Sequence, residues 1–98
     1  MIKVRFLPAA EIELLCEVAY YAKFRAETAL RFQSAVQASV SRAANHPFGG
    51  APSFKKTRSI LVKGFPFSVV YRVSVAELLI VAIAPHRKRP TCWATRVE

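Results

Sequence analysis

The chain has 98 residues, of which 53% are hydrophobic, and a formal net charge of +9. This length and composition predict a single domain over residues 1–98 with a genuine core, and they exclude a disordered chain. The apolar runs are shorter than the roughly 20 residues of a membrane-spanning helix, and the N-terminus lacks the apolar region of a secretory signal. We therefore expect a cytoplasmic protein with no membrane contact.

The positive charge is unevenly distributed along the chain. Residues 1–27 contain four basic and four acidic side chains, which cancel. Residues 28–98 contain eleven basic residues against two glutamates, and they account for the whole net charge of +9. Such a field favours an acidic partner, either nucleic acid or an acidic protein segment. A basic surface kept for solubility is the alternative.

The first half of the chain predicts a strand followed by helix. Residues 2–7 alternate apolar and basic side chains, as a half-buried strand does. Residues 9–45 show two apolar stripes at helical spacing: Ile12, Leu15, Ala19 and Ala22, then Ala29, Phe32, Val36, Val40 and Ala43. A single helix of this length would reach about 55 Å, against a radius of gyration of about 13 Å for a domain of this size. We therefore expect a helical hairpin that turns around residues 24–27.

The second half predicts a sheet. The breaker cluster "HPFGG" ends the helical region, and three strands follow at residues 58–62, 67–74 and 77–84. The short connections between these strands favour antiparallel neighbours. The predicted architecture is an α+β fold of order β-α-α-β-β-β, in which an antiparallel twisted sheet carries the helical hairpin on one face.

Cysteine and histidine are too scattered to predict a metal site. Cys16, His46, His86 and Cys92 have no metal-ligand spacing, so we expect neither a metal nor a cofactor. Cys16 falls in the first predicted helix and is expected to be a small core residue. A disulfide is not expected in a cytosolic chain.

The candidate partner-binding residues are cations on the strands and a basic, aromatic segment after the last strand: Arg58, Arg72, His86, Arg87, Lys88, Arg89, Trp93 and Arg96. Each has an alternative role. Arg58 and Arg72 could instead pair with a glutamate such as Glu77, because an unpaired buried charge is costly. His86 could act as a general base or bond the nearby backbone, and Trp93 could cover the sheet edge.

The order of these features resembles a known superfamily. The strand, the helical hairpin, "HPFGG", "FPFSVVYRV", "LLIVAIAPHRKRP" and the terminal W-x-x-R are similar to the RelE/ParE toxins of bacterial type II toxin–antitoxin modules. The resemblance implies a cytoplasmic toxin that a cognate acidic antitoxin binds. It also implies a homodimer or a toxin–antitoxin heterotetramer as the assembly.

The superfamily contains two activities, and the resemblance separates them. RelE-like members cleave messenger RNA on the ribosome with basic residues at positions that here hold Ser59, Leu61 and Ser68. ParE-like members share the basic "H-x-x-R" after the last strand, which implies inhibition of DNA gyrase by binding and no catalytic residues. The alternatives are an mRNA endonuclease and a non-toxic remnant that only binds its antitoxin. The endonuclease would use Arg58, Arg72, His86 and Arg89.

Overall fold

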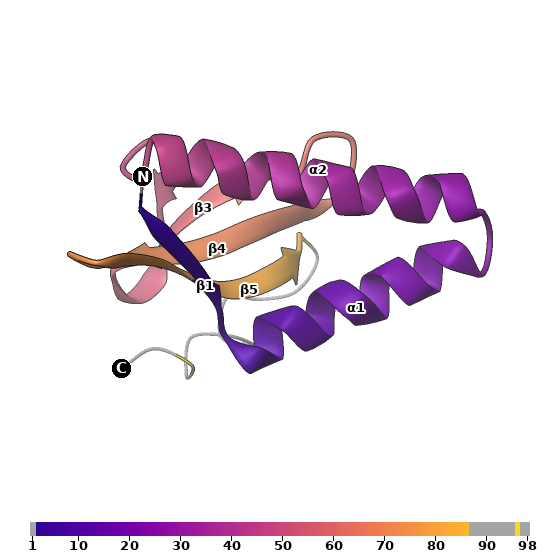
Figure 1. Cartoon of the computed structure of the whole chain (residues 1–98), viewed down its shortest axis with the longest axis horizontal. Helices are drawn as coiled ribbons and strands as arrows, with labels where there is room; N and C mark the ends of the chain where they lie inside the picture. The colour runs from indigo at the N-terminus through magenta and orange to yellow at the C-terminus, as the bar shows by residue number, and fades with distance from the viewer. Residues whose placement is uncertain (1, 87–95, 97–98) are drawn as a thin grey trace.

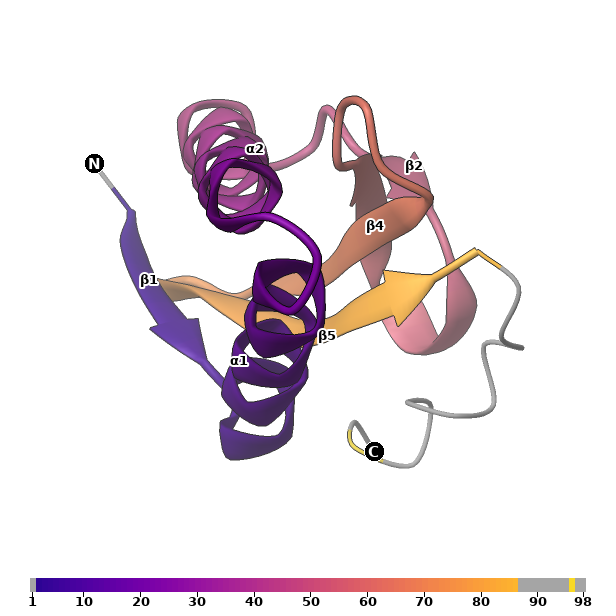
Figure 2. The same ribbon diagram turned by 90° about the vertical axis from the view of Figure 1, so that its right-hand side faces the viewer.

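A computed structural model of the chain describes residues 2–86 and Arg96. Its elements are β1 (Lys3–Phe6), α1 (Pro8–Ala22), α2 (Ala26–Asn45), β2 (Ala51–Pro52), a 3₁₀ turn (Phe54–Lys56), β3 (Arg58–Leu61), β4 (Phe67–Val73) and β5 (Glu77–Pro85). Figures 1 and 2 show α1 and α2 as a hairpin packed against the sheet. The predicted α+β fold and its order of elements are confirmed, and β2 is a short addition.

The sheet has the strand order β1-β5-β4-β3-β2. Pairing is antiparallel from β3 to β5, as predicted, and also between β2 and β3, but β1 lies parallel to β5. The sheet is therefore mixed rather than wholly antiparallel. Short turns enforce antiparallel pairing only between consecutive strands. Between β1 and β5 the chain passes through the hairpin and three strands, so no short turn sets their relative direction.

The second helix follows its sequence pattern. Each member of the predicted stripe is buried: Ala29, Phe32, Val36, Val40 and Ala43. The ring of Phe32 lies 5.1–5.2 Å from the rings of Tyr21, Phe65 and Phe67, so one side chain joins both helices to the sheet. The turn between the helices occupies residues 23–25, which overlaps the predicted 24–27 but begins one residue and ends two residues earlier.

The first helix does not follow the predicted stripe. Ile12 and Leu15 are 61% and 60% exposed, whereas Ala10 and Leu14 are buried. Cys16, predicted to be a core residue, is exposed as well. The reason is that α1 is apolar on two faces, so periodicity alone could not decide which face meets the sheet.

The sheet alternates as expected on β4. Phe67, Val69 and Tyr71 belong to the core beneath the helices, and Val70 faces the other way. An irregularity between Val70 and Tyr71 shifts the register with β5. On the second face of the sheet, Val70, Val81 and Ala82 are all at most 2% exposed. Within the described residues, no helix is long and apolar enough to cross a membrane.

Candidate partner-binding site

Arg58 holds the loop that contains the "HPFGG" motif. Its Nη1 donates hydrogen bonds to the carbonyl oxygens of Phe48, at 3.0 Å, and Gly50, at 2.8 Å. The guanidinium also lies 5.4 Å from the centroid of the Phe48 ring, within the range of a cation–π contact. Among the described residues, Arg58 is therefore held by carbonyl oxygens and an aromatic ring and not by a carboxylate.

Tyr71 ties the same loop to the core. Its hydroxyl donates to the carbonyl of Pro47 at 2.9 Å and accepts from the amide of Gly50 at 3.0 Å. A Cβ atom at Gly50 would lie 2.4 Å from that hydroxyl oxygen and 2.9 Å from the Ser59 carbonyl. Only glycine therefore fits at this position of the motif.

Arg72 lies on the face of β4 opposite the helices and is half-buried. Within the described part of the chain it forms no ion pair. Glu77, its predicted partner, instead binds Arg5, with Nη2–Oε1 at 2.9 Å and Nε at 3.1 and 3.2 Å from the two carboxylate oxygens. The hydrogen bonds and charge of Arg5 lower the pKa of Glu77, and Glu77 raises the pKa of Arg5.

His86 is fixed where β5 ends. Its amide donates to the carbonyl of Pro66 at 3.0 Å, and its Nε2 lies 2.9 Å from the Ser68 hydroxyl. The predicted backbone bond is present, but it is made by the main chain of His86, and the ring bonds a side-chain hydroxyl. Arg87, Lys88, Arg89 and Trp93 lie outside the described residues.

The described members of the set proposed for an endonuclease, Arg58, Arg72 and His86, do not surround one point. Arg58 pairs directly with Tyr71 and so shares the face beneath the helices, whereas Arg72 is on the opposite face. His86 bonds Ser68, which lies four residues from Arg72 on the same strand, a separation of about 13 Å. A single phosphate cannot touch side chains held so far apart without large movements.

Arg96, predicted to contact a partner, forms an internal ion pair. Its Nη1 and Nη2 lie 2.8 and 3.0 Å from the two carboxylate oxygens of Glu13 on α1. Nη1 also donates to the Val81 carbonyl at 3.1 Å, and Glu13 accepts the amide of Ile83 at 3.1 Å. No local sequence pattern signals this role of Glu13, because the ion pair joins residues 83 positions apart.

Several exposed apolar side chains lie on the helical hairpin. We call Ile12, Leu15, Cys16 and Ala19 the outer stripe of α1, because they share its exposed face. Further exposed apolar side chains continue toward the tip of the hairpin: Tyr20, Phe24 and Leu30. Contiguous patches of this kind typically mark interaction sites. No cluster of three or more potential metal ligands occurs among residues 2–86 and Arg96.

Comparison with known proteins gives the family. Residues 4–90 match the family model described as the ParE toxin of the type II toxin–antitoxin system, parDE. The chain belongs to the ParE toxin family. The resemblance predicted from the sequence is confirmed, and this ParE-like chain is a toxin component of a type II toxin–antitoxin module.

A solved structure supports the same fold for this ParE-family toxin. A chain described as belonging to the chromosomal ParDE TA system from P. aeruginosa superposes with a TM-score of 0.75. The two chains are 21% identical, and the match covers 87% of this chain and 96% of the other. At this identity the likeness shows the fold alone. No curated protein sequence matches the chain.

Proposed function

We propose that this ParE-family toxin inhibits DNA gyrase by binding and that a cognate antitoxin neutralises it. One observation carries the choice of binding over RNA cleavage. The described members of the alternative catalytic set, Arg58, Arg72 and His86, lie on two faces and at two ends of the sheet. Cleavage of a phosphodiester needs such groups preorganised around one phosphate. Binding makes no such demand.

The antitoxin is proposed to cover the outer stripe of α1. Ile12 and Leu15 are more than half exposed, and burying such side chains contributes about 1.5–3 kcal/mol each relative to exposure. The net charge of +9 adds attraction for an acidic segment, so affinity should fall as salt rises. DNA gyrase and the antitoxin as partners imply that the toxin is cytoplasmic. The free toxin would be a homodimer, or the complex with the antitoxin would be a heterotetramer.

A supercoiling assay tests the gyrase proposal. Purified toxin is added to gyrase, relaxed plasmid and ATP, and supercoiling and linear DNA are followed on a gel. We expect supercoiling to stop and cleaved DNA to accumulate. The control is toxin premixed with the acidic protein from the neighbouring reading frame, which should restore supercoiling.

Two outcomes would contradict the proposal. Normal supercoiling together with discrete cuts in translated messages, seen by primer extension after induction, would favour the ribosome-dependent endonuclease. Normal supercoiling, uncut messages and unharmed cells would favour the non-toxic remnant. Native mass spectrometry of the free toxin and the complex would give the stoichiometry in each case.

A further inference from the structure

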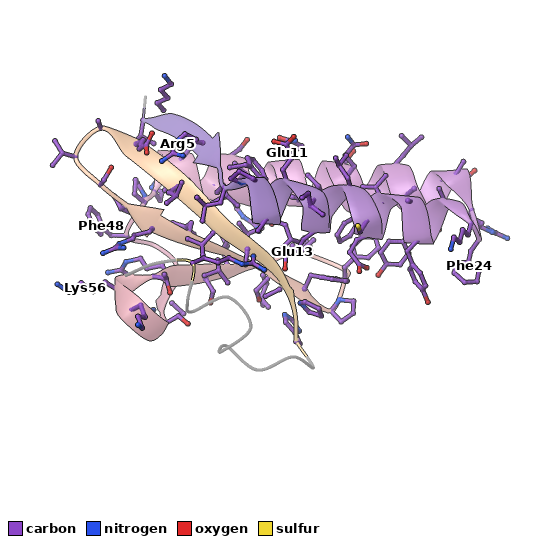
Figure 3. All side chains as sticks on the ribbon, turned by 90° about the horizontal axis from the view of Figure 1, so that it is seen from below. Arg5, Glu11, Glu13, Phe24, Phe48 and Lys56 are labelled. Carbon is purple, nitrogen blue, oxygen red and sulfur yellow. The ribbon has the colours of Figure 1, made fainter. Side chains whose placement is uncertain are left out.

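A cavity of about 480 Å³ lies between α1 and the end of the sheet. The helix contributes Glu17, Tyr20 and Tyr21, and the ends of β4 and β5 contribute Phe67 and His86. Figure 3 shows this side of the molecule, where β5 runs beside α1 with Glu13 between them. The cavity is mostly walled by rings, and it contains a single carboxylate.

The carboxylate of Glu17 has no bonded partner among residues 2–86 and Arg96, although the residue is half-buried. By contrast, Glu13 and Glu77 each bind an arginine. A carboxylate that is partly removed from water is stabilised by a cation, and a ring-lined wall strengthens the interaction. Among the described residues, Glu17 is therefore a carboxylate without a bonded cation, in a protein with a net charge of +9.

The next turn of α1 shows which cation this flank of the helix accepts. Glu13 lies four residues before Glu17, which places the two carboxylates on one flank, about 6 Å apart along the helix axis. Glu13 holds the guanidinium of Arg96 through both carboxylate oxygens, at 2.8 and 3.0 Å. The space between α1 and β5 is thus wide enough for a planar guanidinium at one of these two glutamates.

We infer that the Glu17 cavity binds an arginine side chain presented by the antitoxin. Guanidinium fits a carboxylate through paired hydrogen bonds and also stacks on aromatic rings, which an ammonium does less well. Tyr20 is 52% exposed and adjoins Cys16 and Ala19 of the outer stripe along the helix, so a segment on that stripe reaches the cavity. The identity of the partner rests on the proposed function, whereas the chemistry of the cavity does not.

The first experiment uses a small probe and the full-length toxin. N-acetyl-arginine methylamide is titrated while the amide signals of Glu17, Tyr20 and His86 are followed by NMR. We expect saturable shifts at millimolar probe, and none with the neutral isostere N-acetyl-citrulline methylamide. Glu17→Gln should weaken probe binding about fivefold, as loss of one exposed ion pair does, and Tyr20→Ala should also weaken it. The matched control Glu11→Gln removes an exposed charge from the same helix outside the cavity and should change nothing.

The second experiment measures antitoxin affinity for the same variants. Glu17→Gln should lower it by a similar factor and Glu11→Gln should not. Equal shifts with arginine and citrulline probes, or unchanged binding in Glu17→Gln, would overturn the inference. Probe binding that appears only after Arg87, Lys88 and Arg89 are replaced by alanine would also overturn it, in favour of the chain's own cations. If wild-type toxin binds no antitoxin, the proposed function fails, while the probe titration still tests the cavity.

Discussion

The two helices of the hairpin differ in how much of their apolar surface the toxin itself uses. α2 has six buried residues, spaced along one stripe from Ala29 to Ala43, and its other face is largely polar. α1 has two buried residues, Ala10 and Leu14, and exposes Ile12 and Leu15 on its outer stripe. A helix that is apolar on both faces is normally covered on both. The folded toxin therefore buries the apolar face of α2 and leaves one apolar face of α1 exposed.

The helices are alike in one respect: each has side chains that hydrogen-bond backbone groups at an edge of the sheet. Where β1 ends, the edge of β5 is hydrogen-bonded by side chains instead: Glu13 accepts from the amide of Ile83, and Arg96, which Glu13 binds, donates to the carbonyl of Val81. Past the two residues of β3 that pair with β2, the carbonyl of Leu61 accepts hydrogen bonds from Ser39 and Arg42 of α2. Unpaired strand edges invite pairing with other chains, and these side chains bond the parts of β5 and β3 that β1 and β2 leave unpaired.

The largest expected effect is on stability, from the buried face of α2. Phe32→Ala removes a fully buried ring that contacts three other rings, and should lower the free energy of unfolding by about 3–5 kcal/mol. Leu15→Ala on the outer stripe of α1 should change it by less than about 0.5 kcal/mol. Denaturant unfolding followed by circular dichroism measures both. Similar losses for the two variants would end the distinction between the helices.

The second effect concerns binding, from the exposed face of α1. Leu15→Lys keeps a good helix former but places a charge in the proposed antitoxin interface, and should weaken antitoxin binding at least tenfold, about 1.4 kcal/mol. Gln33→Lys adds the same charge to the exposed face of α2 and serves as the matched control. Isothermal titration calorimetry gives both affinities. An unchanged affinity for Leu15→Lys would show that the outer stripe serves something else.

The same contrast explains what the sequence could predict about the fold. α2 is apolar on one face only, so its spacing predicts five of its six buried residues from Ala29 to Ala43, all except Ser39. In α1 the apolar residues of the exposed face have the same helical spacing as a buried stripe. The spacing therefore predicts that Ile12 and Leu15 lie in the core, although both are exposed. The pattern shows that a face will be covered, but not whether the toxin or a partner covers it. Likewise, β1 carries no local signal of its parallel pairing with β5.

For the candidate site, the sequence predicts which residues lie on strands and loops better than it predicts their hydrogen-bond and ion-pair partners. Arg58 and Arg72 lie on strands as expected, and "HPFGG" forms a loop. The carbonyl bonds of Arg58 and the Tyr71–Gly50 link depend on how that loop folds back, which residue types do not reveal. The Glu13–Arg96 pair joins the two ends of the chain, and only the assembled fold brings them together.

The third effect tests the edge that α1 closes. Glu13→Gln retains an oxygen that can accept the Ile83 amide but loses the charge that holds Arg96. The two side chains are 31% and 22% exposed, so we expect a loss of about 1–2 kcal/mol in the free energy of unfolding. Denaturant unfolding at low and high salt is the measurement, and the difference from wild type should shrink with salt. Glu11→Gln should remain within about 0.5 kcal/mol, and an equal loss there would point to general charge effects.

The smallest effect tests the edge that α2 closes. Ser39 is fully buried and donates to the Leu61 carbonyl at 2.9 Å, while Arg42 donates to the same oxygen at 3.0 Å. Ser39→Ala should therefore cost only about 1 kcal/mol in denaturant unfolding, because Arg42 still satisfies the carbonyl. The exposed Ser41→Ala is the matched control and should change little.

A double-mutant cycle decides whether the two donors act together on this edge. Arg42→Ala alone also leaves the Leu61 carbonyl with one donor, from Ser39. The double variant leaves the oxygen with neither, so its loss should exceed the sum of the single losses by at least about 0.5 kcal/mol. Strict additivity would show no net coupling, because the hydrogen bond from Arg42 Nη2 to Ser39 Oγ, at 3.2 Å, is already lost in either single variant.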